Sequence, residues 1–131
     1  MNTYRKVRTA KGPANDLAAF QARVAANDFH AMSGPALGAV IAVYGSTYAV
    51  ARRLIARIVC ALTAKNSSRT IIMHNAVYAD EYGIMFDELG WYVKLKINLD
   101  DGDAEVCSCH LTRREMMTKS GRIPAYDPER S

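Results

Sequence analysis

Residues 91–111 contain the feature that most restricts the fold, two alternating apolar–polar segments on either side of an acidic turn. Over residues 91–99, apolar side chains occupy every second position and mostly polar ones lie between them. This alternation is typical of a β-strand with one buried face. The turn sequence at 100–103, Asp-Asp-Gly-Asp, predicts that residues 104–111 return as the second strand of a hairpin. Since an isolated hairpin is marginally stable in water, other elements must cover its apolar face.

A long amphipathic helix, predicted over about residues 47–65, is the natural cover. Its apolar residues form two adjacent rows at helical spacing, Val50, Leu54, Ile58 and Leu62 in one and Ala51, Ile55 and Val59 in the other. Arg53 and Arg57 lie one turn apart on the opposite side. We therefore predict an α+β fold, with N-terminal helices packed on a C-terminal antiparallel sheet that contains the 91–111 hairpin.

The remaining segments give weaker signals. The chain of 131 residues is expected to form one domain, with irregular ends at 1–12 and 120–131. The other predicted elements are an arm or first strand over 3–9, a helix over 15–27 capped by Asn15, a helix over 36–44 broken at 45–47, a strand over 69–75, an irregular stretch over 76–83, a short strand over 84–86, and a helix over 113–119 capped by Thr112.

The charge is distributed unevenly along the chain. Residues 1–69 carry ten Lys and Arg against two acids (net +8), whereas residues 70–131 carry seven against eleven (net −4). Such asymmetry fits a basic half that faces nucleic acid or an acidic protein, although solvated charge alone produces it equally well. The candidate binding residues are Arg5, Lys6, Arg8, Arg52, Arg53 and Arg57.

The N-terminus is polar and basic, with no apolar segment of the kind that a secretory signal needs. The longest apolar stretch, residues 35–51, is too short to span a bilayer. The sequence thus predicts a cytoplasmic protein without a membrane partner, in which Cys60, Cys107 and Cys109 are reduced thiols. Cys60 is expected to be packed as a small hydrophobic residue.

The length of the hairpin loop decides which residues share a face of the sheet. With a two-residue loop, Val93 faces His110, and the histidine joins the apolar side. With a three-residue loop ending in a left-handed Gly102, Leu95 faces Cys107, Val93 faces Cys109, and both cysteines become core. We favour the second register, because cysteine is commonly buried. It places Tyr92, Lys94, Lys96, Ser108 and His110 together on the polar face.

That polar face is the candidate catalytic site. Lysine supplies positive charge for a phosphate, and histidine titrates near neutral pH, as a general acid or base must. Arg113 follows the strand directly and can stabilise negative charge in a transition state. The candidate catalytic set is Lys94, Lys96, His110 and Arg113, and the alternative is an ordinary solvated sheet face.

Other chemistries find less support. Cys107 and Cys109 would point away from His110 on a strand, so a metal site is not expected, and no cofactor-binding motif is present. Residues 41–50 resemble a helix-turn-helix only faintly, because the second helix is too apolar to read base edges.

Three functions stay open. The first is a small binding or inhibitor protein that acts on nucleic acid or a ribonucleoprotein. The second is a metal-independent ribonuclease, because the predicted order of elements resembles that of RelE-type ribonuclease toxins, in which a strand and helices precede an antiparallel sheet with a basic face. The third is a protein–protein accessory module or homo-oligomer. The oligomeric state and the physiological partner are left open.

Overall fold

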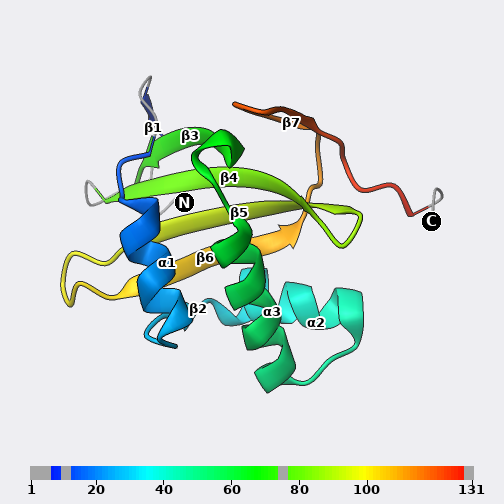
Figure 1. The fold of residues 1–131 in the computed structure, drawn as a ribbon, viewed down its shortest axis with the longest axis horizontal. Helices are drawn as coiled ribbons and strands as arrows, with labels where there is room; N and C mark the ends of the chain where they lie inside the picture. Colours follow the sequence, from blue (N-terminus) through cyan, green and yellow to red (C-terminus); the bar gives the residue numbers. More distant parts are fainter. Residues whose placement is uncertain (1–6, 10–12, 74–76, 129–131) are drawn as a thin grey trace, which may run out of the picture.

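The computed structural model describes residues 7–9 (backbone only), 13–73 and 77–128. Their main feature is a six-stranded sheet with strand order β1-β3-β4-β5-β6-β2, flanked by helices (Figure 1). The strands are β1 (Val7–Thr9), β2 (His30–Ala31), β3 (Ser67–Ile72), β4 (Tyr78–Phe86), β5 (Leu89–Ile97) and β6 (Ala104–Leu111). The α+β class is confirmed. The sheet is mixed rather than antiparallel, because β2 pairs with β6 in parallel.

Three α-helices precede most of the sheet in the chain. They are α1 (Leu17–Ala25), α2 (Ala39–Tyr44), which continues a π-helical segment η1 (Ser33–Gly38), and α3 (Tyr48–Ala61); a 3₁₀ turn, η2 (Ala64–Asn66), leads into β3. Asp16, not Asn15, caps α1, and its side chain accepts a hydrogen bond from the Ala19 amide. Gly45 ends α2 in a left-handed conformation, as its position predicted, and Thr47 caps α3.

The long helix ends four residues before its predicted end, at Ala61. Leu62 is already extended, and Thr63 begins the 3₁₀ turn, where its side chain accepts a hydrogen bond from the Lys65 amide. In the described part of the chain, no single helix is long and apolar enough to cross a membrane; η1–α2 and α3 reach that criterion only as a pair bent by 104°.

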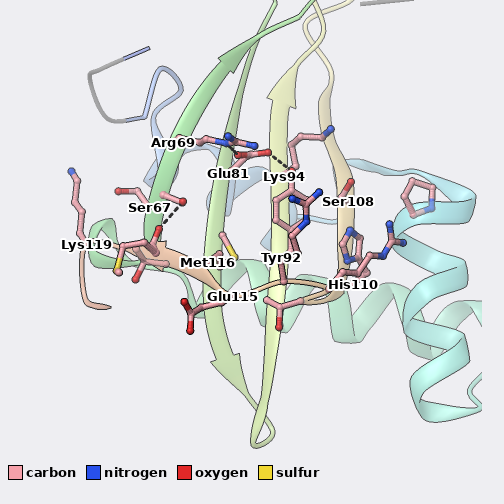
Figure 2. Close-up of a pocket in the computed structure, with 17 residues that line it drawn as sticks. Ser67, Arg69, Glu81, Tyr92, Lys94, Ser108, His110, Glu115, Met116 and Lys119 are labelled. Carbon is pink, nitrogen blue, oxygen red and sulfur yellow. Dashed lines mark hydrogen bonds and ion pairs between the residues drawn. The ribbon is translucent and has the colours of Figure 1, made fainter. Parts of the chain in front are cut away.

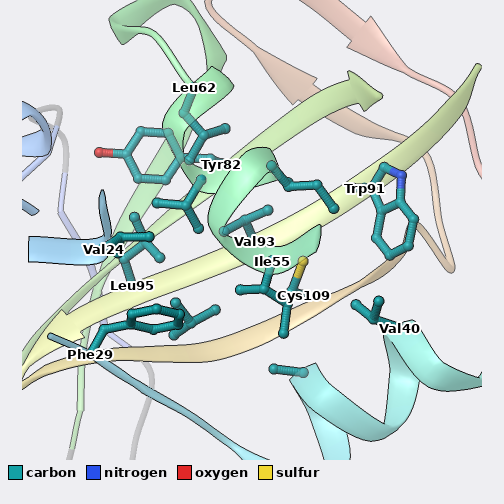
Figure 3. Close-up of a cluster of buried hydrophobic side chains, with 14 of the residues drawn as sticks. Val24, Phe29, Val40, Ile55, Leu62, Tyr82, Trp91, Val93, Leu95 and Cys109 are labelled. Carbon is teal, nitrogen blue, oxygen red and sulfur yellow. The ribbon is translucent and has the colours of Figure 1, made fainter. Parts of the chain in front are cut away.

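One buried cluster joins the helices to one face of the sheet (Figure 3). The apolar stripe of α3 contributes Ala51, Ile55, Ile58 and Val59, all fully buried. The sheet contributes Tyr82 from β4, Trp91, Val93 and Leu95 from β5, and Cys109 from β6. The predicted apolar face of the hairpin is thus the core face.

The predicted register is correct in the half of the hairpin that lies far from the turn, and it differs from the prediction in the half next to the turn. Val93 pairs with Cys109 and Tyr92 with His110, as predicted, but Leu95 pairs with Val106 instead of Cys107. A β-bulge inserts Cys107, so that Val106 is fully buried and Glu105 pairs with Lys96. The loop has four residues, 99–102, and Gly102 is left-handed (φ +71°). The bulge keeps an acid out of the core and removes Cys107 from it.

The segment expected to be irregular, residues 76–83, is mostly strand. From residue 78 onward it belongs to β4, which pairs with β5 from Ala79 to Phe86. The prediction failed because Asp80 and Glu81 are acidic residues that are nevertheless buried, at 1% and 3% exposure. Each finds hydrogen-bond partners inside the fold, which is the condition for burying a carboxylate.

The helix predicted over 113–119 is wrong. This part of the chain forms a second, two-stranded sheet, β7 (Met116–Thr118) and β8 (Gly121–Ile123). Thr112 does not cap a helix; its hydroxyl donates to the carbonyl of Pro124 at 2.6 Å. Two glycines make room for this hairpin. A Cβ at Gly83 would lie 2.8 Å from the sulfur of Met116, and one at Gly90 would lie 2.7 Å from Ile123.

Candidate functional site

A pocket of about 830 Å³ lies on the sheet face that points away from the core (Figure 2). Glu81, Lys94 and Ser108 line it, and their neighbours along the strands, among them Val93 and Cys109, belong to the buried cluster. Since successive side chains of a strand point to opposite faces, the pocket and the helices occupy opposite sides of the sheet. Residues 112–119 and Pro35 line the pocket around this face.

The floor of the pocket contains a row of polar residues across four strands. Arg69 pairs with Glu81, Glu81 with Lys94, and Lys94 with Ser108. Glu81 forms an ion pair with Arg69, and it also accepts a hydrogen bond from the hydroxyl of Tyr92. The bond to Glu81 raises the pKa of the Arg69 guanidinium, and burial followed by the same carboxylate raises the pKa of Tyr92. Tyr92 therefore keeps its proton, and Glu81 is held by both neighbours.

His110 lies beside Tyr92, with the two rings stacked at 5.0 Å between centroids and 29° between planes. Its Nδ1 is 2.8 Å from the carbonyl oxygen of Leu111, which can only accept, so Nδ1 carries the proton. Neutral His110 then has its lone pair on Nε2. Burial lowers the pKa of His110, and the positive charges of Arg113 and Lys94 lower it further, against the opposing hydrogen bond to Leu111. The neutral, proton-accepting form is therefore favoured at neutral pH.

The charge around the pocket is mainly positive. Five of its lining residues are cationic, namely Arg69, Lys94, Arg113, Arg114 and Lys119, and two are acidic. Glu81 is paired as described above, and Glu115 lies 3.4 Å from Arg122. Arg113, Arg114 and Lys119 are exposed and form no ion pair within the described ranges.

Three of the four predicted catalytic residues meet in this pocket. Lys94, His110 and Arg113 line it, whereas Lys96 lies outside and approaches Glu105, with 3.9 Å between Nζ and Oε2. The bulge at Cys107 causes this pairing, because it brings Glu105 opposite Lys96. Sequence reasoning missed Arg69 and Glu81. An alternating reading of residues 78–86 would have placed Glu81 on the polar face.

The polar face is not the ordinary solvated surface that formed the alternative. Lys94 is 8% exposed and Ser108 is 7% exposed. The hydroxyl of Ser67, at the edge of the pocket, is buried and makes no hydrogen bond within the part of the chain that is described. The Ser67 hydroxyl is thus an exception among buried polar groups, most of which are hydrogen-bonded.

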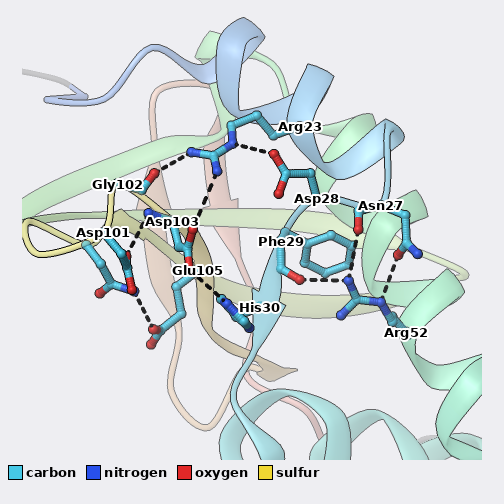
Figure 4. A network of polar contacts seen from close by, with 11 residues as sticks. Arg23, Asn27, Asp28, Phe29, His30, Arg52, Asp101, Gly102, Asp103 and Glu105 are labelled. Carbon is cyan, nitrogen blue, oxygen red and sulfur yellow. Dashed lines mark hydrogen bonds and ion pairs between the residues drawn. The ribbon is translucent and has the colours of Figure 1, made fainter.

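Of the predicted basic residues in the N-terminal half, the structure describes the side chains of Arg52, Arg53 and Arg57, and Arg52 is engaged within the fold (Figure 4). Arg52 donates to the side chain of Asn27 at 2.9 Å and to the carbonyl of Phe29 at 2.7 Å, and its guanidinium covers the Phe29 ring. Arg53 and Arg57 are exposed on α3. Arg5 and Lys6 lie outside the described residues, and of Arg8 only the backbone, paired with Ile71, is described.

The three cysteines occupy different surroundings. Cys109 is fully buried in the core, as predicted, and burial raises its pKa to about 12. Cys107 lies near Glu105, Lys96 and Lys94 on the polar side, and burial again raises its pKa to about 12. Cys60 is exposed, contrary to expectation, and its thiol lies 3.8 Å from the carbonyl oxygen of Gln21. Within the described residues no group of three or more His, Cys, Asp or Glu side chains could hold a metal ion.

Comparisons of the chain with protein-family models, with curated proteins and with solved structures find no match. The pocket itself is therefore the basis for a functional proposal.

Proposed function

We propose that the protein binds single-stranded nucleic acid in the pocket on the polar face of the sheet. The observation that carries the proposal is the arrangement of exposed cations around a half-buried pair of stacked rings, Tyr92 and His110. Nucleic-acid strands present these two features together, a phosphate at every nucleotide and a base with an aromatic face.

The cations supply the phosphate-binding part. Arg113, Arg114 and Lys119 follow one another along the segment that borders the pocket, and Lys94 lies on its floor. Arginine binds phosphate through two parallel hydrogen bonds, and each neutralised phosphate releases counterions. Burial lowers the pKa of His110, and the positive charges of Arg113 and Lys94 at the same place lower it further.

The aromatic rings of Tyr92 and His110 supply the base-binding part. Tyr92 is fixed by its bond to Glu81, so its ring is a rigid surface for a stacked base. Stacking of a base on an aromatic side chain contributes roughly 1–3 kcal/mol. An unpaired strand fits such a pocket, whereas a duplex keeps its bases stacked inside.

The outer side of α3 is the alternative surface for the same ligand. It offers Arg53 and Arg57, but Arg52 is used within the fold, and the guanidinium of Arg57 lies 5.4 Å from the Phe86 ring centroid. The pocket that adjoins Arg57, between α3 and Phe86, has a volume of only about 250 Å³. The sheet face is therefore the better supported site.

Matched charge reversals distinguish the two surfaces. In the test, a fluorescent single-stranded RNA or DNA 20-mer is titrated with wild-type protein, with Arg113→Glu/Arg114→Glu and with Arg53→Glu/Arg57→Glu, at several salt concentrations. We expect the pocket variant to weaken binding by at least 10-fold. We also expect it to reduce the slope of log K against log salt by about 0.7 for each phosphate that the variant no longer neutralises, since single strands release fewer counterions than duplexes.

The helix variant removes the same charge and serves as the control, so its binding should stay within about 2-fold of wild type. If it loses binding while the pocket variant keeps it, α3 is the nucleic-acid surface and the proposal is wrong. If wild-type protein shows no salt-dependent binding to either nucleic acid, a protein partner takes the place of a strand, as in the accessory-module hypothesis.

A further inference from the structure

We infer that the pocket also cleaves the RNA strand it binds, by attack of a ribose 2′-hydroxyl on the adjacent phosphorus with His110 as the general base. This inference rests on the proposed function, because the strand must first occupy the pocket. It assigns a reaction and restricts the substrate to RNA, since DNA has no 2′-hydroxyl.

The geometry of His110 carries the inference. The bond from Nδ1 to the carbonyl of Leu111 fixes the tautomer and the ring orientation, and the stack on Tyr92 supports one ring face. Tyr92 is held in turn by Glu81, which Arg69 holds from the neighbouring strand. A general base oriented by further hydrogen-bonded groups is the usual arrangement around an activated nucleophile. Tyr92, Glu81 and Arg69 act here as positioning residues.

The surroundings of His110 suit a phosphodiester. Lys94 from β5 and Arg113 after β6 are close enough to lower its pKa by their charge. Cations at that position stabilise the extra negative charge of a five-coordinate phosphorus in the transition state. The same charges and the burial keep His110 neutral near pH 7, which is the form that accepts a proton.

The reaction balances without a metal or a co-reactant. Nε2 of His110 takes the proton of the 2′-hydroxyl as the 2′-oxygen forms its bond to phosphorus. The bond from phosphorus to the 5′-oxygen breaks, and that oxygen takes a proton from water. The imidazolium returns its proton to the resulting hydroxide. The products are a 2′,3′-cyclic phosphate end and a 5′-hydroxyl end, with no net change in protons.

The test uses the full chain with a single-stranded RNA 20-mer in the presence of EDTA, with the all-deoxy strand beside it. We expect RNA cleavage that leaves 2′,3′-cyclic phosphate ends, and no cleavage of DNA. His110→Gln should reduce the rate by roughly 100- to 10,000-fold, the range for a lost general base. His110→Ala is the second variant, and the urea midpoint of each shows that it is folded.

His30→Gln is the matched control. His30 is exposed on β2 beside Glu105, at the opposite end of β6 from His110, and its Nε2 lies 3.0 Å from Asp103 (Figure 4). Its cleavage rate should equal that of wild type.

The wild-type rate should also rise with pH and level off below the ordinary histidine pKa of about 6.5. Burial lowers the pKa of His110, and the charges of Arg113 and Lys94 lower it further, against the hydrogen bond to Leu111. The other titratable group against the ring is the stacked Tyr92, and η1 beside β6 has no titratable side chain.

The outcomes separate the inference from the proposal beneath it. RNA that is bound in the pocket and never cut overturns the inference and leaves the proposed function standing. Cleavage that survives in both His110 variants, or that cuts DNA equally, also overturns it. If neither RNA nor DNA binds and RNA is not cut, both fail together.

Discussion

Single residues in this chain are held in conformations that their type does not favour. Asp87 and Glu88 form the two-residue turn between β4 and β5, with φ of 55° and 63°. A turn with both central residues left-handed is type I′, for which Asn-Gly is the favoured sequence. Asp87 is compensated, because its carboxylate accepts a hydrogen bond from the hydroxyl of Tyr44 at 2.9 Å. No hydrogen bond or ion pair is found for Glu88 within the described residues.

Glu88→Gly is therefore expected to stabilise the protein. The left-handed conformation costs a residue with a Cβ about 1–2 kcal/mol, while the greater freedom of glycine in the unfolded chain offsets roughly 0.5–1 kcal/mol of the gain. We expect a net gain of roughly 0.5–1 kcal/mol in the free energy of unfolding, measured in urea. Glu88→Ala is the control, since it removes the side chain and keeps the strain. An equal gain from alanine would show that the backbone is not the cause.

At the scale of elements, the position of the β7–β8 hairpin depends on the two glycines beneath it. A Cβ on Gly90 would lie 2.7 Å from Ile123 and 3.1 Å from both Pro124 and Thr112. Gly90→Ala should lower the free energy of unfolding by roughly 1–3 kcal/mol, the usual cost of overpacking. Gly34→Ala is the matched control, because nothing lies within 4 Å of its Cβ position. If both variants unfold at the same urea concentration, the hairpin tolerates displacement and does not fix the shape of the pocket.

The three α-helices and the strands β1, β3, β5 and β6 could be predicted from the sequence, whereas β2, most of β4 and the β7–β8 hairpin were missed. The failures have identifiable causes. The α3 stripe and the β5 alternation follow from local spacing, which a sequence displays directly. The bulge at Cys107 depends on what Glu105 and Val106 meet across the sheet. The β7–β8 hairpin depends on space above Gly83 and Gly90, which lie far away in the chain. Long-range packing of this kind leaves no periodic signal in a sequence.

At the scale of the whole molecule, cations from both halves of the sequence come together within the described residues. Arg69 comes from the basic half of the chain, and Arg113, Arg114 and Lys119 come from the acidic half, yet all four line one pocket. The acids that give the second half its negative charge are partly neutralised within the fold, as Glu81 and Glu105 are. On the proposed function, net charge per segment indicates the kind of ligand but misplaces the surface that binds it.

Asp80 connects the two halves of the molecule. It is 1% exposed on β4, and it accepts hydrogen bonds from the backbone amides of Ala14 and Asn15, at 2.8 and 2.9 Å, just before α1 begins. The hydroxyl of Thr70 on β3 donates to it at 2.6 Å. One carboxylate therefore ties the start of α1 to the sheet across 66 residues of sequence.

Asp80→Asn replaces one accepting oxygen with an NH₂ group that faces other donors. Because hydrogen bonds to a charged group contribute about 1.5–3 kcal/mol, we expect a loss of at least that size in the free energy of unfolding. The buried Trp91 reports on the sheet by fluorescence, and circular dichroism reports on the helices. Both signals should shift to lower urea concentration together, because the helices and the sheet share one core.

The control is Asp28→Asn. Because Asp28 is in an exposed pair with Arg23, this change should alter the free energy of unfolding by less than about 1 kcal/mol. Separate transitions for the two signals in Asp80→Asn would show instead that α1 docks on a sheet that is stable without it.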